Sequence, residues 1–356
     1  MPTGRELALL RLCALGLVGP QPHDPLVAVQ RLGALQAQDL PGALASIALR
    51  VEGHSHAAVV DAFADGRLVR SWPMRGTLHI VAAADLGWML SLTAARMLAT
   101  SATRRMQVGI TEAVANRARL IADEVLSVAG PITRAALFDQ WREAGLLNHP
   151  QAGVHLLGML CQEQQLVLGP VVGREQLVAR LADWVPSATH RDRDAALAEL
   201  ARRYLNSHGP ATAADLARWA SLPITQARAG IAAVRDEFDA ATIDGVEHLF
   251  APQLPQLLAD HRRDAIRLRL LPGFDEFVLG YADRSFAVAA GFEERLVPGG
   301  NGMFRASIVT GGRVVGTWKR GGTTKRPSLV IEPFAALSAT DQAAAQRAFA
   351  AFPSPS

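Results

Sequence analysis

Two glutamines separated by one residue are the feature of this sequence best suited to chemistry. Gln36-Ala37-Gln38 stands in the segment LGALQAQDLPG, and Pro41 biases the backbone just before it away from helix. Side chains two residues apart share a face of extended backbone, whereas on a helix they point about 200° apart. An amide carbonyl can orient water or stabilise positive charge, and an amide NH2 can hold a phosphate or sugar oxygen. We therefore expect both amides to converge on one ligand at the end of the preceding helix, with helix capping as the competing structural interpretation.

Lysine is nearly missing from the sequence, which limits amine chemistry. Of the 36 lysines and arginines, only Lys319 and Lys325 are lysines. Arginine stays charged and contacts phosphate through a planar fork, whereas a Schiff base requires an amine. The candidate nucleophiles of this kind are therefore the two lysines and, if Met1 is removed, the secondary amine of Pro2.

Other catalytic and metal-binding patterns do not occur in the sequence. No glycine-rich phosphate or dinucleotide motif precedes a helix, and there is no GxSxG nucleophile elbow. His54 and His56 form a loop pair without a third ligand nearby. Cys13 and Cys161 lie 148 residues apart in apolar helical patterns, which predicts two buried, reduced thiols. We expect neither a metal ion nor another cofactor.

An internal repeat indicates the elements that would position these residues. An amphipathic helix, a Gly-Pro pair, a threonine and a second helix ending near a tryptophan occur twice, and the pairs Gly130-Pro131 and Gly209-Pro210 are 79 residues apart. Glycine ends one helix, proline prevents its continuation, and Thr133 or Thr212 can cap the next. A third helix and a β-hairpin are predicted after each copy. Three helices followed by a hairpin are typical of a winged helix-turn-helix domain.

The two ends of the chain complete this organisation. The N-terminal region predicts helices, a hairpin and a connecting helical segment, over 5–17, 25–35, 57–64, 68–72 with 76–82, and 86–116. The C-terminal third predicts short strands with glycine turns and a closing helix, in IRLRLLP, FVLGY, FAVAAGF, FRASIVTGG, RVVGTWKR, LVIEPF and 338–351.

These patterns predict an α+β fold that is mainly helical, with tandem winged helix-turn-helix domains and a C-terminal β-rich module. The expected divisions are an N-terminal winged-helix domain with connecting helices that carries the glutamine motif, two further winged-helix domains, and a basic β-rich module: 1–115, 116–189, 190–258 and 259–356.

Positive charge is unevenly distributed along the chain. The formal net charge is only +3, yet no acidic residue lies between Glu294 and Glu332, and these 37 residues carry +7. Residues 66–111 are also rich in arginine and contain one acid, Asp85. A solvated β surface is one interpretation, and a stripe that follows DNA phosphates is the one we favour. The candidate DNA-binding residues are Arg67, Arg70, Arg75, His79, Arg313, Lys319, Arg320, Lys325 and Arg326.

Four segments together resemble a known family. LGALQAQDLP, SWPMRGTLHIV (71–81), LLPGFDEFVLGYADRS (270–285) and GRVVGTWKR (312–320) are similar, in this order, to segments of the bacterial AlkZ-type DNA glycosylases. The resemblance spans nearly the whole chain and implies a fold of tandem winged-helix domains. One branch of that family carries Gln-x-Asp and the other, which includes genotoxin self-resistance enzymes, carries Gln-x-Gln. This sequence matches the second branch, with Gln36 and Gln38 at the catalytic positions and Asp39 directly after them.

The resemblance implies removal of N7-alkylated guanine and unhooking of interstrand crosslinks. The partner would be double-stranded DNA containing alkylated or crosslinked guanine, and no obligate protein partner is expected. The scarcity of lysine predicts a monofunctional glycosylase that leaves an abasic site. No signal peptide or membrane span is recognisable, so we expect a cytoplasmic protein.

Two other functions remain open from the sequence. A non-enzymatic winged-helix transcriptional regulator would read duplex DNA through the helices near 151–164 and 224–235, but the first contains no basic residue. A protein-interaction module would not need the acid-free basic segment. Trp72 and Trp318 are expected in the core. The carboxylates Asp275, Glu276 and Asp283 are expected to stabilise the fold by pairing with nearby arginines such as Arg284, and a carboxylate that faces the site is the alternative.

Overall fold

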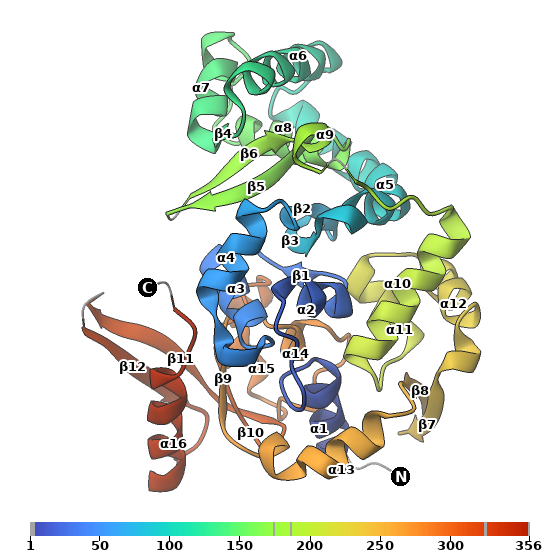
Figure 1. The fold of residues 1–356 in the computed structure, drawn as a ribbon, viewed down its shortest axis with the longest axis vertical. Helices are drawn as coiled ribbons and strands as arrows, with labels where there is room; N and C mark the ends of the chain where they lie inside the picture. Colours follow the sequence, from blue (N-terminus) through green and yellow to red (C-terminus); the bar gives the residue numbers. More distant parts are fainter. Residues whose placement is uncertain (1–3, 174, 186, 324–325, 355–356) are drawn as a thin grey trace. The chain divides into compact units, whose positions relative to one another are not determined.

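The computed structural model describes residues 4–173, 175–185, 187–323 and 326–354. The chain divides into two compact units, which we call unit 1 (Met1–Val59 with Leu197–Ser356) and unit 2 (Val60–Ala196). Both mix helices with antiparallel strands, as the α+β prediction expects (Figure 1). The tandem winged-helix arrangement and the four domain ranges stay predictions.

Unit 2 is built on a twisted antiparallel sheet. The hairpin β2–β3 pairs through β2 with β5, and β5 pairs with β6, which pairs with the short β4. The strands are β2 (Leu68–Met74), β3 (Thr77–Ala82), β4 (Ile132–Thr133), β5 (Leu166–Val172) and β6 (Glu175–Arg180). The helices are α5 (Leu86–Gln107), α6 (Glu112–Ala129), α7 (Arg134–Glu143), α8 (Ala152–Gln162) and α9 (Leu181–Trp184), with η2 at Ala83–Asp85.

The first repeat folds as its capping residues predict. Gly130 ends α6 with a positive φ of 68°, and the Thr133 hydroxyl accepts a hydrogen bond from the Ala136 N–H at the start of α7. The core of this unit contains Trp141, whose indole N–H donates to the Ala118 carbonyl, and the buried Cys161. Trp72 packs against the same core, as expected. Local sequence signals therefore explain the elements of this unit.

Unit 1 begins with helices around the glutamine motif. The helices are α1 (Gly4–Ala14), α2 (Pro25–Leu32), α3 (Leu40–Ala48) and η1 (Glu52–His54), and the strand β1 (Leu35–Gln36) stands between α2 and α3. Helix α4 (His56–Ala64) begins in unit 1 and ends in the residues of unit 2. Helix α2 is shorter than predicted because Gly33, at a φ of 80°, ends it. Helix α3 was missed by the sequence pattern, which is apolar on nearly every side; its buried residues include Leu44 and Ile47. Cys13 is buried in α1, and burial raises the pKa of its thiol to about 11.

The second repeat lies largely in unit 1. Thr212 and Asp215 form a reciprocal capping box at the start of α11, so the predicted cap is confirmed. The hairpin turns at Asp244-Gly245, also as predicted. The elements are α10 (Arg193–His208), α11 (Ala213–Ala220), α12 (Ile224–Ala232), η3 (Arg235–Glu237), β7 (Asp239–Ile243), β8 (Val246–Phe250) and α13 (Leu254–Ala265).

A four-stranded antiparallel sheet of order β12-β11-β10-β9 forms the C-terminal part of unit 1. Its long β11–β12 hairpin lies beside helix α16 (Figure 1). Trp318 is 8% exposed and packs against Phe349 and Phe352 of the closing helix segment, so its predicted core position is confirmed. The elements are β9 (Arg269–Leu271), α14 (Glu276–Leu279), α15 (Glu293–Leu296), η4 (Pro298–Gly300), β10 (Ser307–Thr310), β11 (Arg313–Thr323), β12 (Arg326–Pro333) and α16 (Ala339–Ala350).

Two strand predictions in this part are wrong. FVLGY forms the helical turn α14, because the Asp275 carboxylate caps it by accepting a hydrogen bond from the Phe277 N–H. FAVAAGF is irregular backbone. A short apolar run buried on all sides has no periodicity that separates strand from helix. In the described part of the chain, no helix is long and apolar enough to cross a membrane.

Candidate functional site

The glutamine motif lies in extended backbone between α2 and α3. Gln36 ends β1 and is 7% exposed, Ala37 is fully buried, and Gln38 is exposed. The segment is therefore non-helical, with Gln36 in a strand and Gln38 in a bend, and the convergence of the two amides on one ligand stays a prediction. The C-cap of α2 is Gly33, whose N–H is bonded to the carbonyls of Gln30 and Val29. The two glutamines thus differ in environment: one is enclosed and the other faces solvent.

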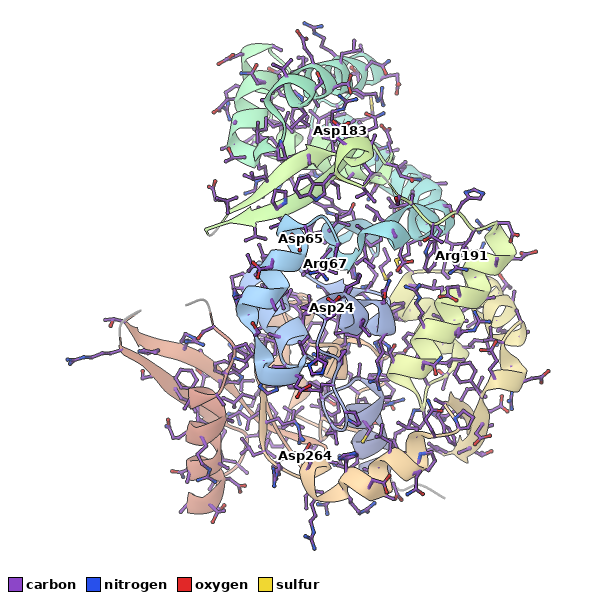
Figure 2. All side chains as sticks on the ribbon, in the orientation of Figure 1. Asp24, Asp65, Arg67, Asp183, Arg191 and Asp264 are labelled. Atoms are coloured by element: carbon purple, nitrogen blue, oxygen red, sulfur yellow. The ribbon has the colours of Figure 1, made fainter. Side chains whose placement is uncertain are left out.

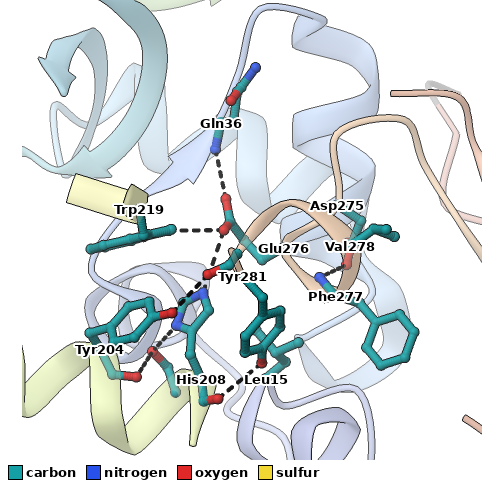
Figure 3. A network of polar contacts seen from close by, with 12 residues as sticks. Leu15, Gln36, Tyr204, His208, Trp219, Asp275, Glu276, Phe277, Val278 and Tyr281 are labelled. Carbon is teal, nitrogen blue, oxygen red and sulfur yellow. Dashed lines mark hydrogen bonds and ion pairs between the residues drawn. The ribbon is translucent and has the colours of Figure 1, made fainter. Parts of the chain in front are cut away.

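The backbone of Gln36 is held by a carboxylate from the other end of the sequence. Its N–H donates to Glu276 Oε1 over 3.2 Å (Figure 3). The second oxygen, Oε2, accepts from Trp219 Nε1 over 3.0 Å and lies 3.4 Å from His208 Nε2. Glu276 is 1% exposed, and the Gln36 side chain extends away from it (Figure 3). Glu276 therefore ties β1 to helices α10 and α11.

The neighbouring carboxylate fixes the helix that follows the motif. Asp275 forms a bidentate pair with Arg50, over 2.9 and 3.0 Å, and accepts from the Ser46 hydroxyl over 2.7 Å. Ser46 lies in α3 and Arg50 directly after it. Burial alone would raise the pKa of Asp275, but the Arg50 guanidinium and the hydrogen bonds hold it below its ordinary value. The carboxylate is thus ionised and paired in the interior.

The expected partners of the three carboxylates need correction. Asp275 does pair with an arginine, but with Arg50 rather than a neighbour in sequence. Glu276 binds N–H groups, and Asp283 accepts from the backbone and hydroxyl of Ser285. The available sequence signal was the pair of acids inside the apolar run GFDEFVL. Carboxylates in such a run are buried only with partners, and those partners come from distant segments here.

The candidate DNA-binding residues of unit 2 are partly enclosed. Arg75, at the hairpin turn with a φ of 57°, points a guanidinium nitrogen at His79 Nε2 over 2.8 Å. Burial of the ring, with this guanidinium beside it, lowers the pKa of His79 well below its ordinary value, so the imidazole is neutral. Arg70 donates to Gln176 over 3.2 Å, and Arg67 lies near Asp65 at the start of β2 (Figure 2). The β2–β3 hairpin brings Arg75 and His79 into contact, with the His79 ring buried and Arg75 partly exposed.

The candidates of unit 1 that the structure describes are exposed and lie along β11–β12. Lys319 bonds Glu332 over 3.0 Å, and Arg320 lies over the Phe349 ring at 5.1 Å. Arg326 is exposed at the start of β12, where it pairs in register with Thr323. Arg313 is exposed at the opposite end of β11 and donates to the Ser285 carbonyl. Lys325 lies outside the described residues.

Glu332 borders this basic surface. Hydrogen bonding to Lys319, and the charges of Lys319, Arg305 and Arg295, lower the pKa of its carboxyl group. It therefore stays ionised and partly neutralises the lysine. Among the described residues, no group of three or more histidine, cysteine or acidic side chains is arranged to hold a metal ion.

Comparisons with known proteins agree with one another. A family model described as DNA glycosylase AlkZ-like matches residues 29–353. A curated protein of Streptomyces sahachiroi, the interstrand DNA cross-link repair glycosylase, is 28% identical over 323 residues, which is 86% of this chain and 84% of that protein. The solved structure of Streptomyces sahachiroi DNA glycosylase AlkZ superposes with a TM-score of 0.77 at 25% identity, covering 99% of this chain and 98% of that one.

Proposed function

The chain belongs to the AlkZ-like DNA glycosylase family, and from this premise we propose that it hydrolyses the N-glycosidic bond of N7-alkylated guanine in double-stranded DNA, including guanines joined by interstrand crosslinks. The observation that carries the proposal is the Gln36-Ala37-Gln38 motif, held in extended backbone next to a buried carboxylate. The relative of 28% identity is named for crosslink repair, which supports the crosslinked substrate.

The chemistry needs little from a general acid. Alkylation at N7 makes guanine cationic, so the base departs as a neutral molecule when its bond to the sugar breaks. The sugar then develops positive charge, and a water oxygen forms the new bond while its proton passes to solvent. An amide carbonyl that faces the sugar can orient this water and stabilise the positive charge. We therefore assign the reaction to the amides of Gln36 and Gln38, without a general acid.

The different exposure of the two glutamines suggests a division of roles. Gln36 is enclosed and its backbone is bonded to Glu276, so its amide is the better group to hold water in one orientation. Gln38 is exposed, so its amide is the better group to reach the sugar–phosphate backbone. Asp39, also exposed, is the N-cap residue of α3. We assign water positioning to Gln36 and backbone contact to Gln38.

The exposed basic residues would supply most of the DNA affinity. Lys319, Arg320 and Arg326 lie on a hairpin that extends from unit 1, a form suited to following a phosphate backbone. Arg313, Arg67, Arg70 and Arg75 are assigned to further phosphate contacts, with His79 orienting Arg75. Lys325 belongs to the same proposal by sequence alone.

The enzyme is proposed to lack lyase activity. Of the two lysines, Lys319 is bonded to Glu332 within the basic hairpin, a setting for phosphate contact rather than for an amine nucleophile. Borohydride should therefore trap no covalent complex with damaged DNA. A trapped complex that disappears on Lys319→Ala would contradict this part of the proposal.

A transcriptional regulator is the weaker candidate. Helix α8, in the position of a reading helix, contains no basic residue and buries most of its length, including Leu156 and Leu160. Helix α12 buries Ala227, Gly230 and Ile231 and carries one arginine, Arg228. Helix α8 thus lacks the charged donors that read base edges in the major groove, and α12 offers a single exposed guanidinium.

Release of free base is the deciding experiment. Duplexes containing one 7-methylguanine, or one interstrand crosslink between guanine N7 atoms, are incubated with the protein, and free or unhooked base is measured by mass spectrometry. We expect release by the parent chain and loss of about 100-fold or more in rate for Gln36→Ala. Gln256→Ala, an exposed glutamine of α13, is the matched control and should retain full activity. No release from either duplex would overturn the proposal.

A further inference from the structure

We propose that Glu276 is a positioning residue of the glycosylase site, which holds Gln36 in its reactive orientation through the Gln36 backbone N–H. The inference rests on the proposed function, because it assumes that Gln36 acts in base removal. It goes further by assigning a role to a carboxylate 240 residues away in sequence. Glu276 would not touch the DNA, since it is 1% exposed.

The geometry around Glu276 is that of an acceptor for several donors. Oε1 accepts from the Gln36 N–H over 3.2 Å, and Oε2 accepts from Trp219 Nε1 over 3.0 Å. A carboxylate has two oxygens that only accept when ionised, so both donors are satisfied at once. A glutamine in this place has one carbonyl oxygen and one NH2 group. It would leave one of the two N–H donors facing another donor.

A second support for the carboxylate comes from His208, which is fully buried. Its Nε2 lies 3.4 Å from Oε2, and its Nδ1 lies 2.8 Å from the Ser207 hydroxyl. Gly280 permits this approach, because a Cβ there would lie 2.6 Å from His208 Cδ2. Tyr204 stacks on the imidazole at 4.5 Å. The carboxylate is therefore packed in place on the side away from Gln36.

Burial also keeps His208 uncharged. The charged groups that act on its imidazole are Glu276, Arg50 and Arg11. Burial lowers the pKa of its imidazole, opposed by the hydrogen bond to Glu276 and by that carboxylate's charge. The charges of Arg50 and Arg11 lower it further. A neutral ring places no additional charge beside the Glu276 carboxyl group.

The adjacent Asp275 makes the arrangement stiff. Asp275 binds the side chains of Ser46 and Arg50 near the end of α3. Glu276 binds the backbone N–H of Gln36. The dipeptide Asp275-Glu276 thus holds the chain before Ala37 through a backbone N–H and the chain after Gln38 through the side chains of Ser46 and Arg50. Near-attack geometry is sensitive to shifts of about 1 Å, which cost about 100-fold in rate. Contacts before and after the glutamine motif limit such shifts of Gln36.

The test separates local positioning from general stability. Glu276→Gln keeps the size of the side chain but loses one acceptor, and Glu276→Asp keeps the charge but withdraws it by one methylene group. Tyr204→Phe is the matched control, because it removes a buried hydroxyl of the same cluster that donates to the Gly280 carbonyl and not to Glu276. Each full-length variant is examined for hydrogen–deuterium exchange of a peptide containing Gln36, single-turnover release of 7-methylguanine, and Kd for DNA containing an abasic-site analogue.

We expect both Glu276 variants to speed exchange at Gln36 and to slow base release about tenfold or more, with Kd changed by less than about twofold. Tyr204→Phe should leave exchange at Gln36 and base release unchanged. If Glu276→Gln does not fold, Glu276→Asp carries the test. Unchanged exchange, or full excision activity in the Glu276 variants, would overturn the inference while leaving the proposed function intact. If the parent chain releases no base at all, the proposed function fails, and the inference falls with it.

Discussion

Two charged regions of unit 1 contrast sharply. One is the carboxylate pair Asp275-Glu276, which is 2% and 1% exposed and bonded to groups from α3, β1 and α11. The other is the basic hairpin surface, by which we mean Lys319, Arg320 and Arg326 on β11 and β12, all exposed. Both contain ionised side chains in one sheet-and-helix framework. They differ in burial: the carboxylates are enclosed by protein groups, and the basic side chains face solvent.

The contrast teaches how a site and a binding surface use charge differently. A buried carboxylate is stable only with its partners in place, so it fixes geometry, and removing one partner leaves an uncompensated group. Exposed charges are screened by water and salt, so each contributes little to folding and remains available to a ligand. We therefore expect substitutions in the first region to change stability and rate, and substitutions in the second to change DNA affinity.

The largest effect is expected from breaking the buried pair. Asp275→Ala leaves the Arg50 guanidinium, 2% exposed, without its bidentate acceptor and should lower the free energy of unfolding by about 3–5 kcal/mol. Urea denaturation followed by circular dichroism measures this loss. A milder variant, Ser46→Ala, removes one hydrogen bond from the same carboxylate and should cost about 1 kcal/mol. If Asp275→Ala lowered the free energy of unfolding by less than about 1 kcal/mol, the buried carboxylates would contribute no more to stability than exposed charges do.

Acid should weaken the same pair. The pKa of Asp275 is held below its ordinary value of 3.8 in the folded chain, so the ionised carboxylate contributes stability that is fully present above pH 3.8. This contribution is lost as the pH falls through the lower folded-state pKa. Urea midpoints measured on both sides of pH 3.8 should fall less steeply for Asp275→Ala than for the parent chain. Parallel curves for the two proteins would contradict the buried ionised pair.

Removing the exposed charges should act on DNA binding alone. The triple substitution Lys319→Ala, Arg320→Ala and Arg326→Ala is expected to raise Kd for duplex DNA roughly tenfold and to reduce the salt slope by about one per lost phosphate contact. The melting temperature should stay unchanged, because all three side chains are exposed. Fluorescence anisotropy at several salt concentrations measures the affinity. A large loss of stability without loss of DNA affinity would show that these three side chains stabilise the fold and do not bind DNA.

The smallest effect is expected at the border of the basic surface. Glu332→Gln removes the carboxylate that bonds Lys319 and Arg305, so it should tighten DNA binding about two- to threefold at low salt. The gain should disappear at high salt, because exposed charges are screened there. Unchanged or weaker binding at low salt would mean that Lys319 and Arg305 do not contact DNA.

Much of the local structure could be predicted, because its signals lie within a few residues of one another. Gly130 and Thr133 mark the turn between α6 and α7, and the capping box of Thr212 starts α11. The extended backbone at Gln36 agrees with the prediction, but Pro41 is not its cause, because Pro41 lies in the first turn of α3. Helix α3 and the turn α14 were not predicted, since apolar segments buried on several sides carry no clear periodicity.

The sequence by itself determined which groups can do the chemistry: two amides in a Gln-x-Gln motif, almost no amines, and an acid-free basic segment. Only the tertiary structure decided that Gln36 is enclosed, that Gln38 is exposed, and that Glu276 receives the Gln36 N–H. The physical reason is the distance along the sequence over which each interaction acts. Caps, turns and helix periods are set by neighbours along the chain, whereas the partner of a buried carboxylate is selected by packing, which brought residues 36 and 276 together.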